Sequence, residues 1–264
     1  SKGFNYFNHG PHLHEYLEEF NRDVFSQYDC MTLAEAPMIK PKKALEYIDE
    51  GNNPVLDMMI QFDTQEADCL FTDFVHMPFN LRKLKRAYSA WQNGLFGRGW
   101  NMLYIENHDH PRMVSRYGSE LYRTESAKML AVSYLFLQGT PFIYQGQEIG
   151  MLNIELDSVD KYKDVLTFNN HNLFKKLGYN EEKFVNHANK VSRETARSPV
   201  QWNAEENAGF TTGTPWIKVN KNYKEINAEK QIEDENSVYN FYRTLIQLRH
   251  EEETIVHGEF ELLM

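Results

Sequence analysis

Four short apolar runs alternate with amphipathic helical patterns in the first 150 residues, and this alternation restricts the possible folds more than any other feature. The apolar runs cover residues 30–37, 55–63, 101–109 and 140–146. Apolar residues at helical spacing predict helices over 11–26, 40–49, 79–94, 124–138 and 236–250. Alternation of strands and helices is typical of right-handed β-α-β units around a parallel sheet. The expected fold class is therefore α/β.

The number of strand-like runs indicates how much of a barrel the chain holds. Its 264 residues would suffice for a complete (β/α)₈ barrel, which typically takes about 250. Four runs are half of eight, however, so we expect the C-terminal half of such a barrel, with about four parallel strands. Residues 155–234 are polar and only patchily periodic, which predicts a mainly helical, irregular tail.

Charge, hydropathy and cysteine usage exclude several classes of partner. The net charge of -10 argues against nucleic acid, since phosphate binding requires a basic face. No apolar run approaches the roughly 20 residues of a membrane helix. Cys30 and Cys69 fit neither a metal spacing nor a disulfide framework. Cys30 lies in an apolar run and is expected to be a buried free thiol, and reduced thiols favour the cytoplasm.

Polar side chains stand near the ends of the four apolar runs. They are Glu35, Asp63, His108, Asp109, Gln147 and Glu148. In a parallel barrel these ends face one pocket, where active sites are found. A single carboxylate in such a place is often only a helix N-cap or a loop ion pair. Two carboxylates and a histidine together are what glycoside hydrolysis requires, since one carboxyl group protonates the leaving oxygen and another attacks or stabilises the sugar.

Five segments in order resemble glycoside hydrolase family 13, the α-amylase superfamily. Three match general family motifs: TLAEAP at 32–37, NHDHPRMVSRYG at 107–118 and GTPFIYQGQEIGM at 139–151. Two more resemble its oligo-1,6-glucosidase and α-glucosidase branch: SRETARSPVQWN at 192–203 and AGFTTGTPWIKVNKNYKEIN at 208–227. NHD alone is a weak motif, but all five in order make a chance match implausible.

The resemblance implies roles for residues that match the family motifs. Glu35 matches the general acid/base. Asp109 matches the third family carboxylate, which binds sugar hydroxyls, and His108 matches the histidine that hydrogen-bonds the same sugar. Both Glu35 and Asp109 are therefore expected to be catalytic, and His108 to bind substrate.

Three further residues are expected to bind substrate. Arg197 matches an arginine that, with an upstream aspartate, holds the non-reducing terminal glucose, a feature of exo-acting enzymes. Its alternative interpretation is a structural salt bridge. Arg112 and Glu148 are expected to line the site, without a defined role.

The chain also departs from the family pattern. The family nucleophile belongs to a G-F-R-x-D segment after the fourth barrel strand, and no such segment is present. The pair Arg22–Asp23 lies in the first predicted helix and is better explained as a surface ion pair. We therefore expect the chain to begin beyond the nucleophile. Residues 1–252 would be a partial catalytic domain with strands 5 to 8, and 253–264 the start of a truncated C-terminal β domain.

Several substitutions surround the expected acid and the NHD segment. Ala34 and Ala36 replace the more usual glycine and methionine beside Glu35, and His110 replaces glutamine. These changes bear on leaving-group specificity and leave the reaction class intact. Elsewhere, the histidines at 9, 12 and 14 have no cysteine or paired acid at metal spacing, so surface histidines are expected.

The expected function is a retaining α-glucosidase that cleaves α-1,6 bonds, and α-1,4 bonds as a second option, from the non-reducing end of short oligosaccharides. Trehalose-6-phosphate hydrolase, dextran glucosidase and sucrose isomerase of the same branch remain alternatives. The chain alone is expected to be inactive. A different class is a non-catalytic, carbohydrate-binding or structural half-barrel that self-associates through its open edges. No cofactor is expected; a structural calcium site, if any, would lie in the N-terminal half.

Overall fold

Four parallel strands form the central sheet of the chain. The structure is a computed structural model that describes residues 9–70 and 72–263. The strands are β1 (Leu33–Glu35), β2 (Met58–Ile60), β5 (Trp100–Leu103) and β6 (Thr140–Pro141). They pair in the order β1-β2-β5-β6, and every pairing is parallel. This arrangement confirms the α/β fold class and the half-barrel.

Each strand is shorter than the apolar run that predicted it. The run at 101–109, for example, pairs as a strand only as far as Leu103. Tyr104 and Ile105 follow with 2% and 1% of their surfaces exposed, so they are buried without being part of the ladder. Hydrophobicity reports burial and not backbone pairing, which is why the sequence overestimated the strand lengths.

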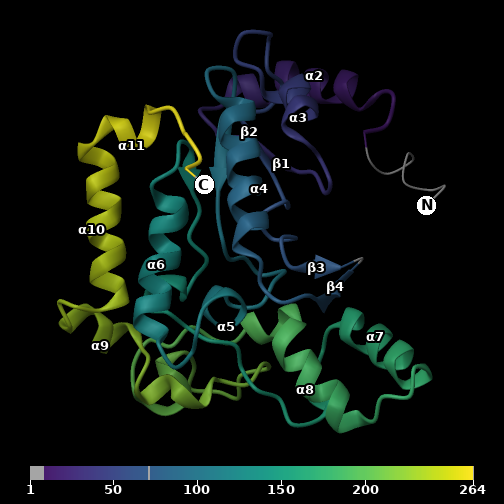
Figure 1. Cartoon of the computed structure of the whole chain (residues 1–264), viewed down its shortest axis with the longest axis vertical. Helices are drawn as coiled ribbons and strands as arrows, with labels where there is room; N and C mark the ends of the chain where they lie inside the picture. Colours follow the sequence, from purple (N-terminus) through teal and green to yellow (C-terminus); the bar gives the residue numbers. More distant parts are fainter. Residues whose placement is uncertain (1–8, 71, 264) are drawn as a thin grey trace.

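Helices cover one side of this sheet. Two pairs pack together: α3 (Pro41–Ile48) against α4 (Leu81–Leu95), and α6 (Arg123–Leu135) against α10 (Val238–Glu251). Figure 1 shows α10 running beside α6. Local signals fix where these helices begin, since Pro41 opens α3, and the side chains of Asn80 and Ser237 cap α4 and α10.

A buried glutamine connects α6 and α10 to the segment after β6. Gln147 belongs to η2 (Gln147–Ile149), and its Nε2 donates to the hydroxyls of Tyr134 and Tyr242 at 2.9 and 2.8 Å. Tyr134 and Tyr242 are 0% and 1% exposed. Gln147 is therefore a structural residue behind the sheet and not a site residue.

The first helix, α2 (Leu13–Asp23), leaves most of its apolar stripe uncovered. Leu13 and Leu17 pack against the core, whereas Tyr16 and Phe20 are 58% and 54% exposed. The helix ends in the expected surface ion pair, with Arg22 Nε 2.7 Å from Asp23 Oδ1. A 3₁₀ turn, η1 (Phe25–Gln27), follows.

The burial expected for Cys30 is wrong. The residue is exposed because β1 begins only at Leu33, which leaves Cys30 in the stretch before the sheet. The expected surface positions of His12 and His14 are confirmed, since each lies against an exposed glutamate of its own helix.

A smaller core lies at the end of the molecule remote from α2 (Figure 1). Its elements are the antiparallel hairpin of β3 (Cys69–Leu70) and β4 (Thr72–His76) and the helices α7 (Val165–Lys176) and α8 (Glu181–Val191). Phe74, Phe174 and Phe184 pack ring against ring in its centre. The tail is mainly helical as expected, but α7 and α8 are more regular than its periodicity indicated. Apolar residues on the open face of α7, such as Leu173, which is 52% exposed, blur that periodicity.

Shorter helices complete the chain. They are α5 (Met113–Tyr117), η3 (Val159–Lys161), η4 (Arg193–Ala196), η5 (Glu206–Gly209), η6 (Lys221–Lys224), α9 (Ala228–Glu233) and α11 (Glu253–His257). Helix α11 occupies the first part of the segment 253–264, whose assignment to a β domain stays a prediction. Among residues 9–70 and 72–263, no helix has the length and apolar character needed to cross a membrane.

Candidate active site

A cavity of 230 Å³ lies at the C-terminal ends of the strands and holds three of the expected site residues. Glu35, the last residue of β1, is exposed there, and His108 and Asp109 follow β5. The rest of the wall is largely apolar and aromatic: Ile60, Phe62, Met102, Tyr104, Phe142, Ile143 and Tyr144, with Glu106 and Asn107. The cavity thus combines three carboxyl groups, those of Glu35, Glu106 and Asp109, with flat apolar surfaces.

The loop that carries His108 and Asp109 is shaped by Asn107. Oδ1 of Asn107 accepts a hydrogen bond from the backbone N–H of Asp109 at 3.0 Å and lies 2.8 Å from Nδ1 of His110. An asparagine that bonds the backbone two residues on forms a tight turn. This turn places Nε2 of His108 3.5 Å from Oδ2 of Asp109.

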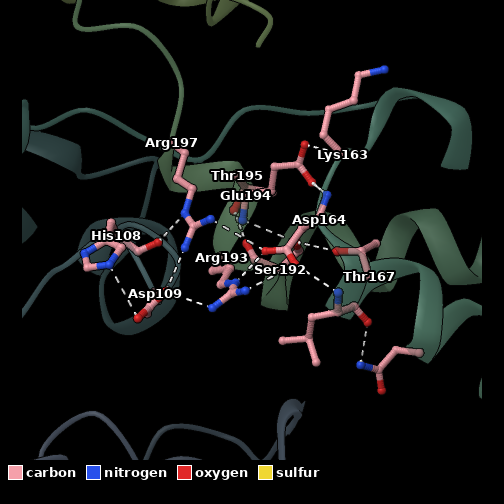
Figure 2. Close-up of polar contacts among 12 residues, drawn as sticks. His108, Asp109, Lys163, Asp164, Thr167, Ser192, Arg193, Glu194, Thr195 and Arg197 are labelled. Carbon is pink, nitrogen blue, oxygen red and sulfur yellow. Dashed lines mark hydrogen bonds and ion pairs between the residues drawn. The ribbon is translucent and has the colours of Figure 1, made fainter. Parts of the chain in front are cut away.

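Two arginines from the tail converge on one oxygen of Asp109, as Figure 2 shows. Arg197 Nη2 donates to Asp109 Oδ1 at 2.7 Å, and Arg193 Nη1 donates to the same atom at 2.9 Å. Arg197 Nε also donates to the carbonyl of His108 at 2.6 Å. Arg197 therefore lies beside the expected pair, whereas the role of Arg193 was missed. Its spacing of four residues from Arg197, within the same motif, was the available signal.

A buried carboxylate holds Arg193 in place. Asp164, 5% exposed at its side chain, accepts from Arg193 Nη2 at 3.2 Å and also from Arg193 Nε. It caps α7 by accepting from the N–H of Leu166 at 2.9 Å. Burial would raise the pKa of Asp164, but the bonds from Arg193 and Leu166 outweigh it and hold that pKa below its usual value.

Glu194 fixes the backbone around Asp164. Its two carboxylate oxygens accept from the N–H groups of Lys163 and Asp164 at 2.6 and 2.9 Å. Glu194 is 3% exposed. The segment that delivers the arginines is thus tied to the start of α7 by buried charged hydrogen bonds, which are stronger than neutral ones.

The structure places Arg112 behind the cavity, so the expectation that it lines the site is wrong. Its side chain is 0% exposed and pairs with Glu106, with Nη1 2.5 Å from Oε1. Glu106 also accepts from the N–H of Met113 at 2.8 Å. The Arg112 guanidinium lies 4.7 Å from the centre of the Tyr144 ring. Arg112 therefore supports a residue of the cavity wall and cannot itself contact a sugar there.

Glu148 and Asp63 also lie outside the set of residues that line the cavity. Glu148 Oε2 accepts from the N–H of Gly146 at 2.8 Å, and partial burial raises the pKa of Glu148. Asp63 pairs with Lys40 and accepts from Trp91 Nε1 at 2.9 Å. Both carboxylates therefore stabilise the local structure near a strand end, which was the alternative to a role in the site.

Two of the substitutions noted beside the family motifs lie outside the cavity wall. His110 is 3% exposed and Ala36 7% exposed, and neither belongs to the cavity wall. Burial lowers the pKa of His110 to about 3, and the nearby positive charge of Arg116 adds to this effect. His110 is thus a neutral, packed histidine.

One group of side chains in the described ranges has the composition of a metal site. Ligand atoms of Asp68, Cys69 and His76 lie within 4.8 Å of one another. Arg116 Nη2 is 2.5 Å from Asp68 Oδ1 and 3.4 Å from Cys69 Sγ. A guanidinium so close to the ligands opposes a bound cation, so this group is better described as a buried ion pair.

The chain is similar to known proteins along nearly its whole length. The chain is 44% identical over 267 residues to the oligo-1,6-glucosidase of Parageobacillus thermoglucosidasius, covering 100% of this chain and 47% of that protein. It is 42% identical over 264 residues to the trehalose-6-phosphate hydrolase of Bacillus subtilis (strain 168), covering 99% and 47%.

Solved structures share the fold. The trehalose-6-phosphate hydrolase of Bacillus licheniformis superposes with a TM-score of 0.94 at 43% identity, covering 100% of this chain and 48% of that one. The isomaltulose synthase of Erwinia rhapontici NX5 gives a TM-score of 0.88 at 36% identity, covering 95% and 45%.

The chain spans about half the length of the curated relatives it matches. A family model described as the catalytic domain of alpha amylase matches residues 2–258. The chain therefore belongs to the α-amylase family.

Proposed function

We propose that this chain supplies the acid half of the active site of a retaining α-glucosidase. The observation that carries the proposal is that Glu35 and Asp109, from different strand ends, line one cavity. Relatives named oligo-1,6-glucosidase match almost the whole chain, which favours short α-1,6-linked oligosaccharides as substrates.

In the proposed mechanism Glu35 donates a proton to the glycosidic oxygen and then removes a proton from the water that releases the sugar. A retaining enzyme needs a nucleophilic carboxylate about 5–5.5 Å from this acid. We propose that this nucleophile belongs to a part of the complete protein outside these 264 residues, since the chain covers only 47% of a matched relative. Glu35, exposed on the edge strand β1, lies where further strands of a barrel would extend the sheet.

Asp109 would hold the sugar in this mechanism. One of its oxygens already accepts from Arg193 and Arg197, which fixes the carboxylate in orientation. The other oxygen faces His108, and the two side chains would bind neighbouring sugar hydroxyls. Arg197 is not among the lining residues, but it bonds both Asp109 and the backbone of His108. An arginine fixed beside the sugar-binding pair supports release of single glucose units from the non-reducing end.

The linkage is the least defined part of the proposal. Relatives and structural neighbours also include a trehalose-6-phosphate hydrolase and an isomaltulose synthase. Several other reactions should therefore be tested beside isomaltose hydrolysis. They are the hydrolysis of trehalose 6-phosphate, of dextran-derived oligosaccharides and of α-1,4 bonds, and the isomerisation of sucrose.

The deciding experiment uses the complete gene product that contains this chain. We expect hydrolysis of isomaltose and p-nitrophenyl α-glucoside, with Glu35→Gln lowering kcat by several orders of magnitude. Glu46→Gln, an exposed glutamate on α3 paired with Lys43, is the matched control and should keep full activity. A small effect of Glu35→Gln would reject Glu35 as the acid.

For the chain by itself we propose no turnover and self-association. The sheet ends in β1 and β6, which pair on one side only within the described residues, and α2 exposes an apolar face. Open edges and apolar faces favour association. Light scattering of the isolated chain should show a dimer or larger species, and a clean monomer would contradict this expectation. If oligosaccharide binding persists without turnover even in the complete gene product, a non-catalytic binding role becomes the better function.

We also propose a cytoplasmic location, supported by Cys30, an exposed cysteine outside any disulfide. We propose a reaction without cofactor, supported by a site built from carboxylates, arginines and a histidine. The boundary between a partial catalytic domain and a β domain near residue 253 stays part of this proposal.

A further inference from the structure

A second, larger cavity of 1040 Å³ lies apart from the candidate active site. It shares no lining residue with the cavity around Glu35. Its walls come from residue 68 and from the segments 76–79, 115–120, 152–155, 186–191 and 218–222. These belong to the β3–β4 hairpin and the turn after it, α5, α8 and two loops, which meet at the lower part of the view in Figure 1. Its volume lies at the upper end of the range for ligand sites, about 300–1,000 Å³.

The walls are held by polar side chains that hydrogen-bond to the backbone: the buried Asn220 and the half-buried Asn189. Asn189 accepts from the N–H of Leu156 at 2.9 Å and donates to its carbonyl at 2.8 Å. Asn220 donates to the carbonyls of Leu152 and Asn153 at 3.1 and 3.0 Å. These bonds fix the loops relative to α8, so the cavity is formed before any ligand arrives, which lowers the ordering cost of binding.

One side of the cavity is apolar and exposed. Met77, Pro78 and Phe79 follow one another along this wall, and Met77 and Phe79 are 46% and 38% exposed. The Phe79 ring is supported by Tyr117, with 5.1 Å between the ring centres. A supported aromatic ring next to proline offers a flat surface for the C–H face of a pyranose.

The remaining lining residues include polar side chains with both signs of charge. Asn186, Lys190, Lys218 and Lys221 offer donors, while Glu120 and Glu155 offer acceptors. The Asp68–Arg116 pair in the floor is internally neutral. Three lysines against two carboxylates nearly cancel, and Glu155 Oε2 is 3.9 Å from Lys221 Nζ.

We propose that this cavity is a second, non-catalytic site for a neutral oligosaccharide. A balanced set of donors and acceptors around an apolar wall matches a ligand that has hydroxyl groups at its edges and C–H groups on its faces. A lipid is disfavoured because polar side chains make up much of the wall. Because the lysines outnumber the carboxylates by one, inorganic phosphate is the alternative ligand that the test includes. The site goes beyond the proposed hydrolysis, since it holds neither Glu35 nor Asp109.

The test uses the chain itself, with isomaltotriose and maltotriose as probes. Binding is measured by calorimetry, and the site is located by amide chemical shifts in two-dimensional NMR. We expect shifts at residues 77–79 and 186–190 and about tenfold weaker binding in Phe79→Ala. Because Phe79 packs on Tyr117, the exposed Asn186→Ala is the second variant, and it should also weaken binding. Glu46→Gln, on α3 and outside both cavities, is the control and should leave affinity at this site unchanged.

Two results would overturn the proposal. The first result is that the trisaccharides change amide chemical shifts only around Glu35, and that Phe79→Ala and Asn186→Ala leave their affinity unchanged. This result would show that the trisaccharides bind only at the candidate active site. The second result is that inorganic phosphate changes the amide chemical shifts of residues 186–190 whereas the trisaccharides change none. This result would show that the cavity is an anion site instead. Sugar shifts at 77–79 and 186–190 that disappear in Asn186→Ala would support the proposal, independently of any catalytic activity.

Discussion

Arg197 donates a hydrogen bond from Nη2 to Oδ1 of Asp109 over 2.7 Å, although the two residues are 88 positions apart. The contact joins the tail of the chain to the end of β5. The same oxygen accepts from Arg193, which Asp164 holds from behind. The tail is therefore part of the candidate site and not an appendage to the half-barrel.

The first prediction concerns this network. Arg193→Gln should lower the free energy of unfolding by about 2–3 kcal/mol, because it leaves the nearly buried Asp164 without its main charged partner. Urea denaturation at pH 7 measures the change. Arg22→Gln, which breaks a fully exposed ion pair on α2, is the matched control and should have no measurable effect. Equal, small effects of both variants would show that the network does not stabilise the fold.

The second prediction concerns the buried pair of Glu106 and Arg112. Both side chains are at most 1% exposed, so removing one leaves an uncompensated buried charge. Arg112→Met alone should cost about 3–5 kcal/mol of unfolding free energy. The double variant Glu106→Leu with Arg112→Met should cost less than the sum of the single variants, because no charge is then left unpaired. Denaturant unfolding of all four proteins checks this cycle, and strict additivity would contradict a direct pairing.

The sequence could place Glu35, His108 and Asp109 near one another because the rule involved is geometric. Parallel strands end at the same edge of a sheet, so residues that follow different strands meet there whatever the loops do. The alternation of strands and helices was readable for a similar reason, since apolar periodicity reports directly on burial.

Other parts could not be predicted because they depend on contacts between distant segments. Nothing local in the sequence distinguishes Arg112, which is buried against Glu106, from Arg197, which reaches Asp109. Both are arginines in a family motif, and only the packing decides that Arg112 is fully buried whereas Arg197 stays partly exposed. The exposure of Cys30 follows from where the ladder of β1 begins, and hydropathy does not report that point.

The third prediction concerns Gly139, between α6 and β6. Its φ is +141°, and an added Cβ would lie 2.3 Å from the carbonyl oxygen of Asn101 on the neighbouring strand. Gly139→Ala should therefore cost more than about 2 kcal/mol, since both the backbone conformation and the contact are unfavourable. Gly97→Ala is the matched control, because Gly97 also has a positive φ of +69° but open space around it. It should cost about 1 kcal/mol. Similar melting temperatures for the two variants would show that β5 can shift to accommodate the added Cβ without a loss of stability.

The fourth prediction is a pH dependence that arises from His110. Burial lowers the pKa of this side chain to about 3, from an ordinary value of 6.5. Between these values the unfolded chain binds a proton that the folded chain does not, so stability should fall as the pH drops from 6.5 towards 3, by an amount on the order of several kcal/mol. His110→Gln removes the titrating group and keeps a side chain that can bond Asn107, so its free energy of unfolding should fall less between pH 7.5 and 5. Urea denaturation across this range measures the difference, in which the carboxylates common to both proteins cancel. His250→Gln, at an exposed position, is the control and should show the same pH dependence of unfolding free energy as the unmodified chain. If His110→Gln also showed that same pH dependence, His110 would take up its proton in the folded state, which would contradict the prediction.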